Sequence, residues 1–252
     1  MSMPEDLPLR IDPAGVVIEQ LVDQVIALSA ESQARFAETY AAHAWQADLR
    51  EPAKFTFDTD PVTVFEPQFL GTTADASNSW LWGWENVNGF PASVLQCAER
   101  VRGVGEHFEV PELTTAIQPL DAEQRRAAGL NAANAAQQTL VYAAMAIAGY
   151  PAPVFYRGPV GQGSYAWFLL DNPDAFSLPA PTTLATAEAF TAAIDSGHLH
   201  DHRLVVQGYA DRREGVDLSE DGPDALLTVS DGVVRIMFDD QGRMSQISGE
   251  VG

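Results

Sequence analysis

The sequence predicts an α+β fold, in which an antiparallel sheet packs with long helices and a small antiparallel meander follows at the C-terminal end. Some stretches repeat apolar residues at helical spacing, whereas others alternate apolar and polar residues as strands do. The two kinds of stretch occur in clusters rather than as a βαβ repeat, which favours α+β over a parallel-sheet fold. We expect an α+β core over 12–178 and a helix with a β-meander over 179–252, and the two regions can pack as one domain.

The chain opens with an amphipathic helix and continues into strands. Asp12 and Pro13 suit the start of a helix, and apolar residues recur at helical spacing over 17–26. The segment 29–32 interrupts this pattern. The apolar positions that resume it toward Asp48 are Phe36, Tyr40 and Trp45. From Lys54 the period changes to two, which predicts strands with the apolar positions Phe55, Phe57, Val62, Val64, Phe69 and Leu70.

A tryptophan-rich strand and two more helices follow. The strand covers 80–84, and an Asn-Gly pair ends it. A helix begins at Pro91, and its apolar stripe closes near two glycines at 103 and 105. Asp121 with Gln124 resembles a capping box, and an Ala-rich helix then runs to Gly149. This composition indicates close packing of the helix against a sheet.

The rest of the chain contains a hairpin, a linker and the meander. Two strands, 154–157 and 164–170, bracket a glycine-rich turn. Asn172-Pro173 and the stretch 179–183 together are the best candidate for a linker. A helix and three strands follow, and we expect them over 186–196, 226–229, 233–238 and 244–247.

The composition restricts the class of partner. The chain has 252 residues, with 35 Asp and Glu against 14 Lys and Arg, and its formal net charge is −21. Because such a surface repels phosphates, we expect neither nucleic acid nor an anionic membrane as a partner, whereas a basic protein fits. Cys97 is the single cysteine, so no intrachain disulfide can form, and we expect a cytoplasmic protein. The longest apolar run, 140–150, is shorter than the ~20 residues that span a bilayer.

The first candidate site is the tryptophan-rich strand. Trp80, Trp82 and Trp84 alternate along it, so they share one face, which could stack a flat ligand or anchor a partner. Glu85 and Asn86 would form the polar rim of such a pocket. The second hairpin adds Tyr156 and Arg157. The alternative is that the rings belong to the core, which we favour because Trp is highly buried on average.

The second candidate is a metal site at His198, His200 and His202. On an extended segment these alternate positions point three imidazoles the same way, as a metal ion requires. A solvated connection is the alternative that we favour. An acidic segment, 217–222, matches only the first half of an EF-hand loop and therefore suits an ordinary turn. We expect no cofactor.

Binding is favoured over catalysis. The sequence has no Gly-x-Ser-x-Gly elbow, no His-Glu-x-x-His helix and no lysine-bearing phosphate loop. Our first hypothesis is an acidic interaction protein that binds a basic partner. The alternative is a small-molecule binder or hydrolase-like enzyme, with a pocket between the tryptophan strand and the Tyr156–Arg157 hairpin.

Several short motifs carry a family resemblance. They are Phe69-Leu-Gly-Thr72, Trp80-Leu-Trp-Gly-Trp-Glu-Asn86, Val101-Arg-Gly-Val-Gly105, Glu112-Leu-Thr114 and Tyr156-Arg-Gly-Pro159. Together they resemble an uncharacterised bacterial family that is classed as a domain of unknown function, over about 12–171. The resemblance implies a bacterial cytosolic protein with a shared architecture, and it implies no catalytic residues.

Overall fold

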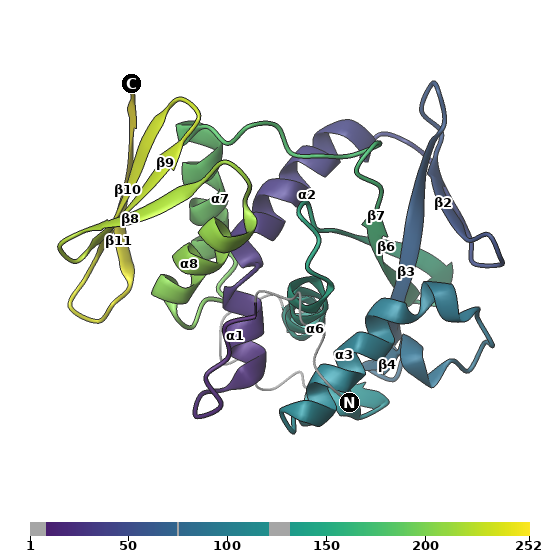
Figure 1. The fold of residues 1–252 in the computed structure, drawn as a ribbon. Helices are drawn as coiled ribbons and strands as arrows, with labels where there is room; N and C mark the ends of the chain where they lie inside the picture. The colour runs from purple at the N-terminus through teal and green to yellow at the C-terminus, as the bar shows by residue number, and fades with distance from the viewer. Residues whose placement is uncertain (1–8, 75, 121–131) are drawn as a thin grey trace.

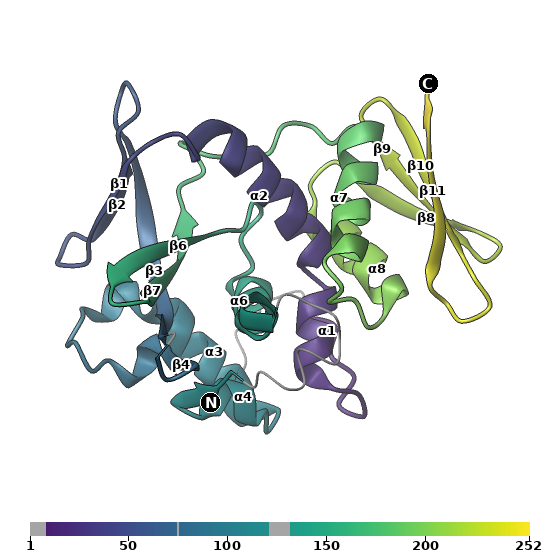
Figure 2. The same ribbon diagram turned by 180° about the vertical axis from the view of Figure 1, so that it is seen from behind.

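Two antiparallel sheets stand at opposite ends of the molecule, with helices between them (Figures 1 and 2). The structure is a computed structural model that describes residues 9–74, 76–120 and 132–252. The larger sheet has seven strands, and the smaller one is a four-stranded C-terminal meander. The predicted α+β class, with its small terminal meander, is therefore confirmed.

The larger sheet is built around the long strand β3. The first residues of β3 pair with β2, its last four residues pair with β4, and residues from Glu66 to Ala74 pair with β7 on the other edge. Every pairing in this sheet is antiparallel. The strands are β1 (Trp45–Asp48), β2 (Lys54–Phe57), β3 (Thr63–Ala74), β4 (Ser79–Trp82), β5 (Ile117–Pro119), β6 (Val154–Gly161) and β7 (Ser164–Asp171).

Helices cover this sheet and fill the space beside it. The face that bears the tryptophans packs on α3 and α6, and α1 packs on the other side of α6 (Figure 1). The helices of this part are α1 (Val17–Asp23), α2 (Ile26–Tyr40), α3 (Gln96–His107), α4 (Pro111–Thr114) and α6 (Ala132–Ala148), with short 3₁₀ turns at Gly83–Glu85 and Ala92–Val94. No helix of the described ranges is both long and apolar enough to cross a membrane.

The C-terminal part packs two helices on one face of the meander. Strand order is β11-β10-β9-β8, and the inward-facing Leu227, Val234 and Ile236 contact a core that includes Phe190 and Tyr209. The elements are α7 (Thr183–Asp195), α8 (His202–Arg212), β8 (Asp217–Asp221), β9 (Asp224–Val229), β10 (Gly232–Phe238) and β11 (Met244–Val251).

Helix α2 belongs to the cores of both parts. Ile26 and Leu28 in its first turn lie in the core of α7, α8 and the meander. Phe36 and Tyr40 in its last turns lie in an aromatic cluster against the larger sheet. Figure 1 shows α2 crossing from one part to the other. One helix therefore supplies apolar surface to both regions of the chain.

The break in the first helix lies earlier than the sequence pattern predicts. The interruption is at Gln24 and Val25, whereas Ser29 and Ser32 are buried inside α2. Helix α8 passes so close to this junction that a Cβ on Gly208 would lie 2.5 Å from the Cα of Gln24. The break therefore lies at a tertiary contact with α8, and it does not lie at the serines.

Other elements also differ from the prediction. Trp45 lies in β1, where it stacks on Phe55, and does not continue the helix. Trp84 lies in a 3₁₀ turn after β4. Helix α8 and strands β5 and β8 were not predicted. Helix α6 ends before Gly149 as predicted, while the Asp121–Gln124 capping box lies outside the described residues.

Candidate functional site

The tryptophans of the predicted site lie inside the protein. Trp80 and Trp82 are 0% and 1% exposed, and Trp84 is also buried. The ring of Trp80 meets the ring of Trp82 edge to face, with 5.1 Å between their centroids. It meets the ring of Trp167 in a tilted arrangement, with 5.9 Å between their centroids. The indole Nε1 of Trp82 donates to the carbonyl of Glu112 at 2.9 Å. The core interpretation of these rings is confirmed, and they offer no open face for stacking a ligand.

Tyr156 and Arg157 lie on opposite faces of the sheet, because neighbouring residues of a strand point in opposite directions. Tyr156 lies among Trp45 and Phe55 in the aromatic cluster. Arg157 lies on the tryptophan face, with its guanidinium 3.5 Å from the ring centroid of Tyr165. The predicted pair therefore splits between two sides of the sheet.

The predicted polar rim is part of a loop closure. Asn86 adopts a left-handed backbone conformation with φ 48°, and its side-chain amide donates to the carbonyl of Phe90 and accepts from the amide of the same residue. Glu85 is exposed. The hollow that Trp82 and Asn86 line has a volume of about 10 Å³. A space of that size is at the limit of what one water molecule needs.

The three candidate metal ligands face three different elements. His198 is buried against the ring of Tyr142 on α6. His200 lies beside α1, and the Nδ1 of His202 accepts the backbone N–H of Met244 on β11. The segment turns into α8 at this point and is not extended, so the imidazoles do not converge. Over 9–74, 76–120 and 132–252, no three His, Cys, Asp or Glu side chains are arranged to hold a metal ion.

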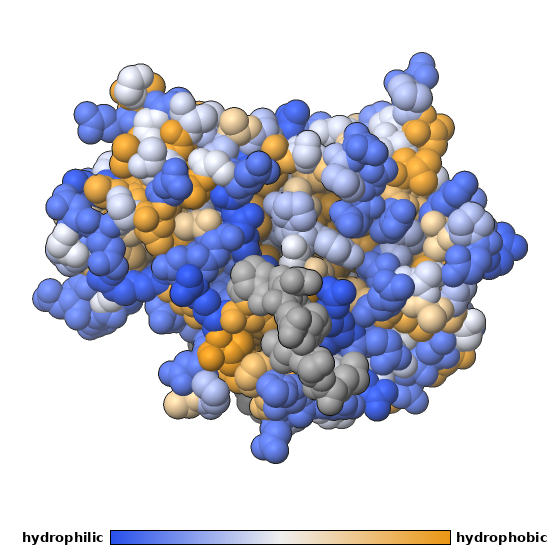
Figure 3. Space-filling model, in the orientation of Figure 1, coloured by the Kyte–Doolittle hydropathy of each residue, from blue (hydrophilic) through white to orange (hydrophobic). Residues whose placement is uncertain are grey.

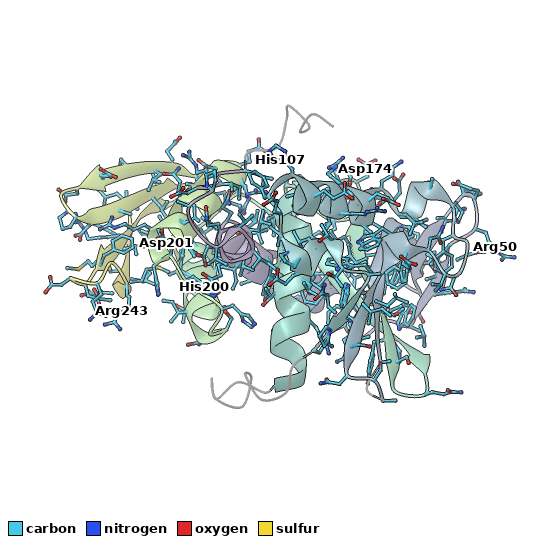
Figure 4. The ribbon with its side chains drawn as sticks, turned by 90° about the horizontal axis from the view of Figure 1, so that it is seen from below. Arg50, His107, Asp174, His200, Asp201 and Arg243 are labelled. Carbon is cyan, nitrogen blue, oxygen red and sulfur yellow. The ribbon has the colours of Figure 1, made fainter. Side chains whose placement is uncertain are left out.

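A groove of about 610 Å³ lies between α1, the segment before it and the start of α8. Carboxylates from three stretches of chain line it, namely Asp12, Glu19, Asp23 and Asp201. Figure 4 shows His200 and Asp201 together at the start of α8, next to α1. The apolar part of the lining includes Ile11, Val16 and Leu204. The groove is thus partly apolar and strongly acidic.

Asp23 holds the wall of the groove together. Its carboxylate is 1% exposed and accepts the backbone N–H groups of His200 at 3.0 Å and Asp201 at 2.8 Å. These bonds satisfy two donors at the start of α8 and fix α8 against the end of α1. Asp201 in turn caps α8 by accepting from the amides of Arg203 and Leu204.

The cationic groups that line the groove already have acidic partners. The guanidinium of Arg10 pairs with the carboxylate of Asp211. His200 lies between two carboxylates, with its Nδ1 3.7 Å from Asp23 and its Nε2 3.7 Å from Glu19. The nearby carboxylate of Asp23 is the main reason that the pKa of His200 is raised above its ordinary value. The lining therefore has a surplus of negative charge.

Sequence reasoning did not find this groove. Asp23 and His200 are 177 residues apart in the chain, and no short motif joins them. One local signal was present, because Asp23 directly follows the buried pair Leu21 and Val22 in the apolar stripe of α1. A carboxylate at such a position requires a hydrogen-bonding partner elsewhere in the fold.

Comparison with known proteins identifies the family. Residues 19–173 match the model of a family of unknown function (DUF6882). No curated protein and no solved structure gives a significant match. The matched range covers most of the chain and includes the tryptophan strand and the Tyr156–Arg157 hairpin. The chain therefore belongs to this family of unknown function.

Proposed function

We propose that this protein acts by binding a positively charged partner, most simply a basic segment of another protein, and that the acidic groove is its contact surface. The observation that carries the proposal is the gathering of Asp12, Glu19, Asp23 and Asp201 around one groove whose single arginine is already paired. A basic side chain placed there would meet carboxylates on both walls.

The charge of the whole chain supports the same partner. A net charge of −21 attracts a cationic partner from a distance and raises the rate of encounter. Hydrophilic residues cover most of the face drawn in Figure 3, and apolar residues lie between them in separate patches. Long-range attraction raises the association rate, and docking in a groove with some apolar lining fixes the position of the partner. Binding in the cytoplasm is part of the proposal, and the single cysteine, which is buried and free, agrees with it.

Calorimetric titration with an oligolysine peptide tests the proposal, with an oligoglutamate peptide of equal length as the control ligand. The decisive variant combines Asp12→Asn with Glu19→Gln. Asp12 accepts the N–H of Ala14 at 2.9 Å, and the side-chain carbonyl that the Asp12→Asn change leaves can accept the same N–H, so the turn is retained. We expect the affinity for oligolysine to fall at least tenfold, about 1.4 kcal/mol.

A second variant, Glu99→Gln with Asp174→Asn, removes the same total charge from exposed positions outside the groove. Figure 4 shows Asp174 well away from His200. We expect this variant to bind oligolysine within about twofold of the original chain, since only long-range attraction changes. Equal losses in the two variants would show that the charge acts diffusely and that the groove is not the contact surface.

A further inference from the structure

The imidazole of His200 lines the acidic groove and faces a carboxylate with each of its ring nitrogens. Its Nδ1 lies 3.7 Å from Asp23, and its Nε2 lies 3.7 Å from Glu19. The side chain is 41% exposed, so it can exchange a proton with water. A titratable ring therefore lies at the surface to which we assign the cationic partner.

The fold fixes the residue that bears this ring. The carboxylate of Asp23, which is 1% exposed, accepts the backbone N–H groups of His200 at 3.0 Å and Asp201 at 2.8 Å. The start of α8 is thereby tied to the end of α1. The imidazole consequently stays beside the two carboxylates of α1 in both of its protonation states.

The two protonation states of the ring suit different contents of the groove. A neutral imidazole has one N–H, so one of its nitrogens presents a lone pair to a carboxylate. The protonated ring has an N–H on both nitrogens and presents one to Asp23 and one to Glu19. The protonated ring therefore supplies the positive charge that these carboxylates would otherwise take from a partner.

The charged groups near His200 come from three stretches of chain. They are Arg10 and Asp12 before α1, Glu19 and Asp23 on α1, and Asp201 and Asp211 at the start of α8 and along it. His202 and Arg203 contact the meander instead. Carboxylic acids ordinarily titrate near pH 4 and guanidinium groups above pH 12. Of the described residues that line the groove, only His200 belongs to a class that ordinarily titrates between pH 5 and 8.

We propose that His200 makes binding in the groove depend on pH, because a proton on its imidazole and a positively charged partner compete for the carboxylates of Asp23 and Glu19. The groove binds its partner tightly when the ring is neutral and weakly when the ring is protonated. This inference deepens the proposed function and rests on it.

The shift of the His200 pKa places this competition near neutral pH. The nearby carboxylate of Asp23 raises the pKa of His200 above its ordinary value near 6.5, against the opposing effect of burial. Above the shifted pKa the ring is neutral and the groove is most negative. Below it the groove carries one more positive charge. Because coupled binding is reciprocal, a bound cation must in turn lower the pKa of His200.

Calorimetric titration at pH 8.5 and pH 5.5, at constant ionic strength, tests the proposal. The probe is an oligolysine peptide blocked at both ends, whose side-chain ammonium groups stay protonated over this range. We expect the affinity to be at least about fivefold lower at pH 5.5. His200→Gln, which cannot take up a proton, should bind with equal affinity at both pH values, within about twofold.

His202→Gln is the matched control, because it removes the neighbouring imidazole that faces β11 and leaves the groove unchanged. We expect this variant to keep the pH dependence of the original chain. A second measurement needs no variant. NMR follows the ring protons of His200 through a pH titration, and saturating oligolysine should move the midpoint to lower pH.

The outcomes separate this inference from the proposed function. Oligolysine that binds through the groove with equal affinity at pH 5.5 and pH 8.5 would overturn the inference alone. An unchanged pH dependence in His200→Gln, or a His200 midpoint that oligolysine does not move, would do the same. Absence of binding at pH 8.5, or equal losses in the two charge-matched variants that test the groove, would overturn the proposed function and this inference with it.

Discussion

At the scale of single residues, the pair of Glu31 and Arg213 gives the sharpest expectation. The carboxylate of Glu31 accepts two N–H groups from Arg213 and the hydroxyl of Tyr209 at 2.8 Å, and it joins α2 to α8. Glu31→Gln leaves a guanidinium buried without its counter-ion, and we expect this to cost about 3–5 kcal/mol of unfolding free energy. Urea denaturation measures the loss.

The same helix supplies the control for that measurement. Glu38 pairs with Arg35 at 2.9 Å, but both side chains are more than half exposed. Glu38→Gln should therefore change the unfolding free energy by less than about 0.5 kcal/mol. If Glu31→Gln and Glu38→Gln cost the same, the buried pair does not join the two parts of the molecule as described.

Two histidines at the start of α8 should have opposite effects on the dependence of stability on pH. Asp23, and to a smaller extent Glu19, raise the pKa of His200 above its ordinary value near 6.5. The stability that protonated His200 contributes is therefore fully present below about pH 6.5 and is lost as the pH rises through the folded-state pKa. His200→Gln should destabilise the protein more at pH 5.5 than at pH 8.5, as measured by urea denaturation.

The pKa of His202 is shifted in the opposite direction, so its effect on stability depends on pH in the opposite way. Burial is the main reason that its pKa is lowered, and its Nδ1 must stay unprotonated to accept from Met244. The folded chain therefore loses stability as the pH falls through about 6.5, where the unfolded chain takes up the proton. His202→Gln should remove that loss. Parallel pH profiles for the two variants would contradict both assignments.

At the scale of elements, close packing has a larger effect on stability than helix propensity does. In an exposed helix, Gly→Ala usually stabilises by about 1 kcal/mol. Gly208 lies in α8 where an added Cβ would come within 2.6 Å of the backbone of Gln24. We therefore expect Gly208→Ala to destabilise the protein by about 1–3 kcal/mol, as overpacking does, in urea or thermal unfolding. A stabilised variant would show that α8 can move away from the α1–α2 junction.

The same contact shows which elements the sequence could predict. The hairpin of β6 and β7 and the buried tryptophan strand were found because alternation along the chain records them directly. The break at Gln24 and the helix α8 were missed because contacts between distant segments determine them. Alternate positions would align the three imidazoles only on an extended segment, whereas Asp23 and Asp201 accept from the backbone amides where α8 starts.

The candidate site was missed for the same reason. The acidic groove depends on the meeting of Glu19 and Asp23 with His200. This meeting leaves no spacing that a motif could detect. Composition gave only the sign of the charge, whereas the fold determines where that charge gathers.

At the scale of the whole molecule, the two parts should unfold together. Helix α2 places Ile26 and Leu28 in the core of the C-terminal part and Phe36 and Tyr40 in the aromatic cluster of the larger sheet. Unfolding one part alone would expose half of α2, and it would leave the carboxylate of Glu31 without its partner Arg213. The free energy of that partial state includes both penalties, which favours a single cooperative transition.

Two probes that report on different parts can measure this cooperativity. All five tryptophans lie between Trp45 and Trp167, so their fluorescence follows the larger sheet only. Methyl NMR signals of Ile236 follow the meander, where this side chain is fully buried. We expect the two urea midpoints to coincide. A chain that ends at residue 178 should lack a cooperative transition at the original midpoint, because α2 loses the partners of its first turn. Separate midpoints for fluorescence and methyl signals would instead mean that α2 does not couple the two parts, and that each unfolds on its own core.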